Sequence, residues 1–157
     1  EEALQYYRSV LETNPGHYAA NRSAGPMLRA RGETDAALVC LRTAIAAHPD
    51  DAETQYELGV ALCDAKAYEE SVEHLRISLQ LDPGNVKAHN NLALALHGAG
   101  RPSEALEHFA AYLNAYPDDD TVHHSYAMAM IDAGKFQQAA DVLTALATAK
   151  PDDALIQ

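Results

Sequence analysis

The chain has no tryptophan, few aromatic residues of any kind, and only two cysteines, Cys40 and Cys63. Two cysteines this far apart in sequence do not indicate a disulfide framework. The cytoplasm is therefore the default location, with the periplasm as the alternative. Tryptophan and other aromatic side chains are the usual anchors of tight interfaces. Because they are scarce here, we expect any binding to be modest in affinity or multivalent.

Basic residues are also scarce, with 11 Lys and Arg against 23 Asp and Glu, which gives a net charge of −12. Phosphate backbones are bound by clustered Lys and Arg, so this charge argues against nucleic acid as a partner. It equally disfavours anionic membrane surfaces. No apolar run approaches the roughly 20 residues that a membrane-spanning helix needs, so no membrane insertion is expected.

Prolines, in contrast, recur at a fixed interval of 34 residues, at Pro15, Pro49, Pro83, Pro117 and Pro151. A period of this length is typical of a repeat protein. Two further columns keep the same interval, one of small residues and one of long aliphatic residues three positions later: Gly25, Gly59, Ala93 and Ala127, then Leu28, Leu62, Leu96 and Met130. Within each repeat the apolar steps are three and four residues, which predicts helices with one buried face.

Each repeat is expected to hold two helices. Between them lie Gly32, Gly100 and Gly134, because glycine readily adopts the left-handed conformation that ends a helix. The second repeat has Ala65-Lys66-Ala67 at this place, which is a less typical stop. The second helix should end at the proline, which cannot continue a helix interior.

These motifs resemble the tetratricopeptide repeat, with its pattern W-x2-L-G-x2-Y, A-x3-F and P. The second repeat reads Gln55-x2-Leu58-Gly59-x2-Leu62, then Ser71-x3-Leu75, then Pro83. The tryptophan column departs from the family pattern and holds Asn21, Gln55, His89 and His123. The resemblance covers essentially the whole chain and implies an all-α fold, a right-handed α-solenoid of stacked antiparallel helix pairs.

The repeat frame predicts a single array over residues 1–157. Its parts are the second helix of a partial repeat at 1–17, full repeats at 18–51, 52–85, 86–119 and 120–153, and the start of a further repeat at 154–157. The sequence thus begins and ends within a repeat, so we expect it to be part of a longer array.

Acidic residues follow the prolines at Asp50-Asp51, at Asp118 to Asp120 and at Asp152-Asp153. Aspartate at a helix start accepts hydrogen bonds from free backbone N–H groups and faces the positive end of the helix dipole. We therefore interpret these residues as helix caps rather than as a cation site. The eight histidines form no H-E-x-x-H pattern, and no phosphate loop, dinucleotide fingerprint or nucleophile elbow is present. We expect no metal, no cofactor and no enzymatic activity.

Pro26 lies inside the expected first helix of the first full repeat, in Ser23-Ala24-Gly25-Pro26-Met27. An interior proline removes one backbone hydrogen bond and clashes with the preceding turn, at a cost of about 3 kcal/mol. The sequence therefore predicts that this helix kinks or breaks near Gly25.

The family resemblance implies that the first helices line a concave surface that binds peptides. The residues that share the outer face of these helices are Arg22, Arg29, Tyr56, Val60, Cys63, Lys87, Asn90, Asn91, Leu94, His97, His124, Met128 and Ile131. Arg22 and Arg29 would make one end of this groove basic and would engage acidic groups. An apolar floor would consist of Val60, Leu94, Met128 and Ile131.

Some members of the family hold acidic chaperone tails with a clamp of Lys, Arg and Asn, from which this chain departs at Pro26, Glu57 and Asn91. The sequence favours a non-catalytic scaffold that binds a peptide or an extended protein segment in the groove. Two alternatives stay open. One is the substrate-recruiting region of a larger enzyme such as a glycosyltransferase. The other is a self-assembling scaffold, a homo-oligomer formed through the ends of the array.

Overall fold

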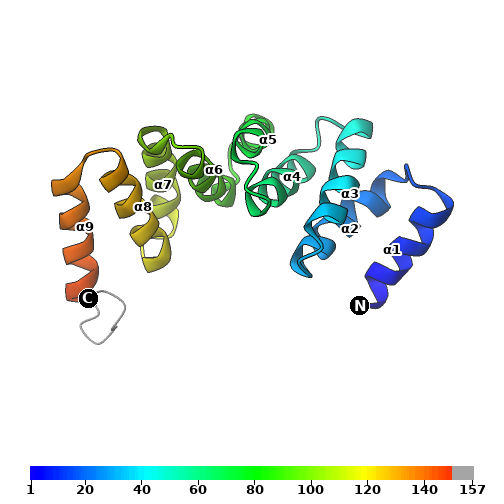
Figure 1. Ribbon diagram of the computed structural model, residues 1–157, viewed down its shortest axis with the longest axis horizontal. Coiled ribbons are helices and arrows are strands. Elements are labelled where there is room, and N and C mark those ends of the chain that lie inside the picture. The colour runs from blue at the N-terminus through cyan, green and yellow to red at the C-terminus, as the bar shows by residue number, and fades with distance from the viewer. Residues whose placement is uncertain (150–157) are drawn as a thin grey trace. The chain divides into compact units, whose positions relative to one another are not determined.

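The computed structural model describes residues 1–149, and every regular element in that range is an α-helix (Figure 1). The nine helices of the described range are α1 (Glu2–Thr13), α2 (Tyr18–Ala30), α3 (Thr34–Ala47), α4 (Ala52–Asp64), α5 (Tyr68–Leu81), α6 (Val86–Gly98), α7 (Pro102–Ala115), α8 (Asp120–Asp132) and α9 (Phe136–Ala149). The predicted all-α fold is confirmed. The expectations for Pro151, for the Asp152-Asp153 cap and for residues 154–157 lie outside the described residues.

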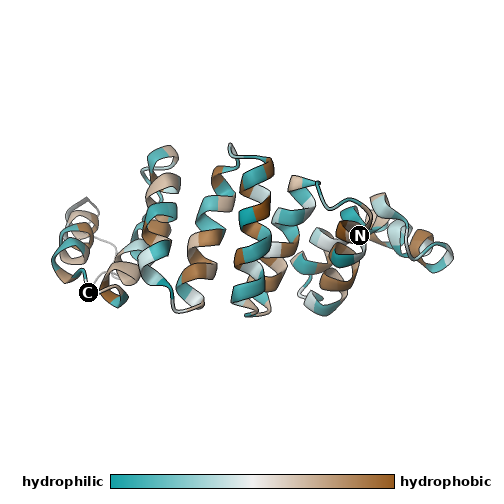
Figure 2. Ribbon diagram, turned by 90° about the horizontal axis from the view of Figure 1, so that it is seen from above, coloured by the Kyte–Doolittle hydropathy of each residue, from teal (hydrophilic) through white to brown (hydrophobic). Residues whose placement is uncertain are grey.

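Successive helices pack against one another as antiparallel pairs, as in α2 with α3, α4 with α5 and α8 with α9. Contacts divide the chain into two compact units, Glu1–Ala88 and the part from His89 onward, with the boundary inside α6. Apolar and polar stretches occur together on the helices (Figure 2), as one-sided burial requires. No helix in the described range is long and apolar enough to cross a membrane.

Glycines in the first unit let paired helices approach closely. A Cβ atom added at Gly25 of α2 would lie 2.5 Å from Leu41 Cγ of α3. The same relationship recurs one repeat later, where a Cβ at Gly59 would lie 2.6 Å from Leu75 Cγ. Both leucines are fully buried. The column of small residues in the sequence is therefore explained by a leucine of the second helix, which fills the space above each glycine.

The second unit is built around Phe109, which is fully buried on α7. Its ring lies 6.0 Å from the ring of Tyr126 on α8. Leu92 and Leu96 of α6 are also fully buried, and Met130 of α8 is nearly so. The column of long aliphatic residues thus contributes to the core of this unit, as it does to the core of the first unit.

The turns inside the helix pairs use the left-handed conformation. Gly32, Gly100 and Gly134 have φ values of 77°, 74° and 75°. Lys66 occupies the equivalent place in the second repeat and has φ 60°, which is the one positive φ of a non-glycine residue in the described range. The less typical stop therefore has the same backbone geometry as the glycine stops, at a cost in strain that glycine does not incur.

The first helices carry side-chain caps that recur every 34 residues. His17, Asp51, Asn85 and Asp119 accept hydrogen bonds from the backbone N–H groups of Ala20, Glu53, Ala88 and Val122. The interpretation of Asp51 and Asp119 as helix caps is confirmed. A histidine and an asparagine perform the same task in the other two repeats.

Pro26 does not interrupt its helix, since α2 runs unbroken from Tyr18 to Ala30. Of the predicted kink or break near Gly25, the break is therefore wrong, and the kink stays a prediction. Proline removes one N–H group only, the one that would bond to the carbonyl of Arg22. Ala24, Gly25 and Leu28 are buried on either side of it and hold both halves of the helix against the core.

Candidate functional site

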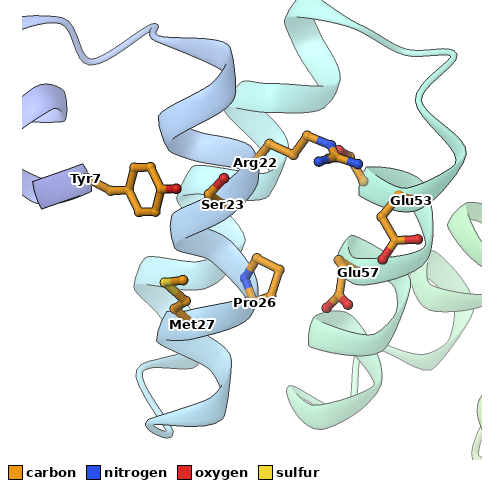
Figure 3. Close-up of a pocket in the computed structure, with 8 residues that line it drawn as sticks. Tyr7, Arg22, Ser23, Pro26, Met27, Glu53 and Glu57 are labelled. Carbon is orange, nitrogen blue, oxygen red and sulfur yellow. The ribbon is translucent and has the colours of Figure 1, made fainter. Parts of the chain in front are cut away.

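A pocket of about 260 Å³ lies on the first helices of the N-terminal unit (Figure 3). Its lining has three kinds of side chain: the largely apolar Tyr7, Pro26 and Met27, the acidic Glu53 and Glu57, and the hydrogen-bonding Arg22, Ser23 and Thr54. Tyr7 comes from α1, and the other lining residues come from α2 and α4. The arrangement places apolar and acidic chemistry side by side on one surface.

Helix periodicity explains why these residues share a surface. Arg22, Ser23, Pro26 and Met27 are separated by steps of one, three and four along α2, so they occupy one side of that helix. Figure 3 shows Pro26 directed toward α4, from which Glu53 and Glu57 project. The pyrrolidine ring is short and carries no polar atom, so it leaves open the space that a longer side chain would fill.

Asp51 is the centre of a hydrogen-bond cluster beside the pocket. Its carboxylate accepts hydrogen bonds from the hydroxyls of Tyr18 and Thr54 and from Arg22 Nε, the last at 2.7 Å. Partial burial alone would raise the pKa of Asp51, but the bonds from Thr54, Tyr18 and Arg22 outweigh it and hold this pKa far below its usual value. Arg22 is thereby fixed to a carboxylate of its own chain.

Arg29 is also engaged within the chain. Its Nη1 lies 3.3 Å from Asp64 Oδ2, and its Nη2 lies 3.6 Å from Glu57 Oε2. The second distance is too long for a hydrogen bond. Arg29 Nε and Glu57 Oε2 are both buried without a hydrogen-bond partner. Burial raises the pKa of Glu57, although the charge of Arg29 opposes this.

The expectation that Arg22 and Arg29 make this end of the groove basic needs correction. Around these two arginines stand four carboxylates, Asp51, Glu53, Glu57 and Asp64, three of which pair with them. The local balance is therefore acidic. Sequence alone did not show this, because the partners of Arg22 and Arg29 lie 29 and 35 residues away in sequence.

The other predicted groove residues of the first unit lie on α4. Tyr56 and Cys63 are half-buried, and burial raises the pKa of the Cys63 thiol. Val60 is only 7% exposed and belongs to the core, so its expected place in an exposed apolar floor is wrong. Cys63 and the buried Cys40 are both free thiols, as the sequence predicted.

The remaining predicted residues lie on α6 and α8. Lys87 is exposed at the start of α6, and Asn90, Asn91, Leu94 and His97 are half-buried along it. On α8, His124 is exposed, Met128 is 39% exposed and Ile131 is half-buried. His97 Nε2 lies 2.6 Å from Asp132 Oδ2, which joins α6 to α8. Asn90 Oδ1 is buried without a hydrogen-bond partner.

Sequence reasoning missed Tyr7, Ser23, Met27 and Thr54 as site residues. Tyr7 falls in an apolar column of the repeat, which favoured a role in the core. It does pack beside the buried cluster that contains Leu4, but it also lines the pocket. Met27 directly follows Pro26 and lies outside the steps of three and four used to choose the groove face. Within the described residues, no group of three or more His, Cys, Asp or Glu side chains could hold a metal ion.

Comparison with known proteins gives a consistent result. The family model of the tetratricopeptide repeat matches residues 23–149. No match was found among curated proteins. MamA from Desulfovibrio magneticus RS-1 has a TM-score of 0.85 at 18% identity, over 98% of this chain and 86% of that one.

A second similar structure is YrrB, described as a TPR protein with an unusual peptide-binding site. It has a TM-score of 0.80 at 17% identity, over 96% of this chain and 77% of that chain. At such identities the likeness to both structures concerns the fold alone.

Proposed function

Because this chain belongs to the tetratricopeptide repeat family, we propose that it is a non-catalytic scaffold that binds a peptide or an extended protein segment along the outer faces of its first helices. The observation that carries this proposal is the pocket formed by α2 and α4, together with Tyr7 of α1. Its open side displays apolar, hydrogen-bonding and charged side chains, which is the mixture that peptide recognition requires.

The first helices of the second unit support the same role. Met128 is exposed on α8, with His124 exposed one turn before it and Ile131 half-buried after it. Methionine is flexible and polarisable, so it adapts to side chains of different shape. Each unit therefore contributes an exposed methionine on a first helix, Met27 in the first and Met128 in the second.

The test is selection of peptides from a random display library on the immobilised protein, followed by affinity measurement for the selected peptides. We expect Met27→Gln and Met128→Gln to weaken binding, because each places a polar amide on a surface meant for apolar contact. Both side chains are more than a third exposed, at 38% and 39%, so the folded state should tolerate the change.

Matched controls are Val39→Gln and Phe136→Gln, which put the same amide group at exposed apolar positions of second helices, 67% and 66% exposed. These variants should bind as the unmodified protein does. Equal losses in both sets, or no selected peptide at all, would contradict the proposal. Light scattering on the same samples tests the rival role, since a self-assembling scaffold would grow in mass with concentration.

A further inference from the structure

We propose that the pocket formed by α2 and α4 receives a lysine or arginine side chain of the bound peptide. This inference rests on the proposed function and names the chemistry that one part of the surface recognises. It reverses the charge preference that the sequence suggested for this end of the groove, since the expected ligand is basic rather than acidic.

The acidic wall of the pocket is the first argument. Glu53 and Glu57 are one turn apart on α4, so both carboxylates face the same side. Glu57 Oε2 is buried without a hydrogen-bond partner, and the nearest cationic nitrogen, Arg29 Nη2, is 3.6 Å away. Buried polar atoms are nearly always hydrogen-bonded, so an atom of this kind needs a donor.

The two arginines near the pocket are already neutralised by carboxylates of the chain. Arg22 is held by Asp51, whose carboxylate also accepts from Tyr18 and Thr54. An acidic ligand would have to displace a carboxylate anchored by three side chains. A basic ligand competes with the longer, 3.6 Å ion pair between Glu57 and Arg29, and the net charge of −12 attracts it from a distance.

The apolar wall suits the rest of a basic side chain. Lysine and arginine carry their charge at the end of an aliphatic stem, which packs on apolar surface. Pro26 and Met27 offer that surface on α2, and Tyr7 adds an aromatic ring that attracts cations. A volume of about 260 Å³ is below the range of pockets for drug-sized ligands, so it fits one side chain better than a whole small molecule.

The experiment uses a display library in which Lys, Arg, Asp and Glu are equally represented. We expect the selected peptides to be enriched in Lys or Arg. Each selected peptide is then labelled with fluorescein and its affinity measured by anisotropy, beside a version with norleucine in place of the basic residue. Loss of the cation should weaken binding about tenfold, the effect of one charge-assisted hydrogen bond.

The protein variants are Glu53→Gln and the double variant Glu53→Gln with Glu57→Gln. They should reproduce the same loss and should no longer distinguish lysine from norleucine. Glu53 is exposed, so the single variant tests the idea even if the double variant is unstable. The matched control is Glu2→Gln with Glu73→Gln, which removes two exposed charges from second helices of the same unit and should change little.

Two results would overturn the inference. Peptides without basic enrichment, bound equally by the Glu53 and Glu57 variants but lost with Met27→Gln and Met128→Gln, would refute the basic pocket and leave the proposed function standing. Failure to select any peptide would overturn both.

Discussion

The side-chain amide of Gln55 donates a 2.7 Å hydrogen bond to the carbonyl oxygen of Pro49, six residues earlier in the chain. The same bond joins Asn21 to Pro15 at 2.7 Å and His123 to Pro117 at 2.8 Å. In the family pattern tryptophan stands at these positions. Here a polar side chain occupies the column and ties the starts of α2, α4 and α8 to the turns that precede them.

Replacement of Gln55 by alanine should destabilise the first unit by about 2 kcal/mol, because it leaves a carbonyl without its partner and opens a small cavity. Gln55 is 3% exposed, and its Oε1 lies 2.7 Å from His74 Nδ1, so His74 also loses a partner. Urea denaturation followed by circular dichroism measures the change. Gln80→Ala, at an exposed position of α5, is the control and should have almost no effect.

The close approach of Leu41 on α3 to Gly25 on α2 leads to a second prediction. Alanine there would place its Cβ 2.5 Å from Leu41 Cγ, so Leu41 or the helix backbone must move. We expect a loss of about 2 kcal/mol, typical of overpacking in a tight core. Gly16→Ala is the control, because the nearest atom to its Cβ is a side-chain oxygen of Asn14 at 3.8 Å. Equal stability of the two variants in thermal melts would refute the packing argument.

The fold could be predicted from the sequence because the repeat imposes each local signal several times. One glycine followed by a leucine three residues later carries little information, but the column from Gly25 to Ala127 keeps its phase through the chain. The structure gives the reason, since Leu41 and Leu75 fill the space above the two glycines. The helix caps were predictable for the same reason, as Asp51 and Asp119 recur in one column.

The site could not be predicted to the same degree, because it depends on side chains that meet across helices. The sequence gives no signal that Arg22 is bound by Asp51, which leaves the surface acidic rather than basic. Val60 was expected on the exposed face, but neighbouring side chains cover it and leave it 7% exposed. Pro26 was expected to kink or break its helix, yet the helix is unbroken, because burial of Ala24 and Leu28 outweighs the loss of one hydrogen bond.

Lys66 offers a stabilising substitution. Its φ of 60° strains any residue with a side chain, and the other three turns of this type have glycine there. Lys66→Gly should therefore raise the free energy of unfolding by up to about 1 kcal/mol, since relief of strain exceeds the added entropy of the unfolded chain.

The converse change, Gly100→Ala, serves as its counterpart. No atom lies within 4 Å of the Cβ it would add, so strain at φ 74° is the sole cost, and stability should fall by a similar amount. Denaturant titration of both variants measures the two effects. If Lys66→Gly is instead less stable, the interactions of the lysine side chain contribute more free energy than the backbone strain at φ 60° costs.

Asp51 should make the stability of the first unit depend on acid. Its folded pKa lies below the unfolded value of about 3.9, as the bonds from Thr54, Tyr18 and Arg22 favour the charged form over the opposing effect of burial. The stability that it contributes is therefore present above about pH 4 and is lost as the pH falls below that value. Asp51→Asn should be less stable at pH 7 by about 2 kcal/mol, because an amide accepts these bonds more weakly.

The distinguishing measurement is the difference in unfolding free energy between the two proteins as a function of pH. It should shrink as the pH is lowered from 5 toward 2, because in this range Asp51 of the unfolded chain takes up a proton while the folded protein keeps this carboxylate charged. Asp50→Asn is the control at the neighbouring exposed position. Its difference from the unmodified protein should stay small over the whole range. A pH-independent difference for Asp51→Asn would mean that the hydrogen bonds of Asp51 do not depend on its charge.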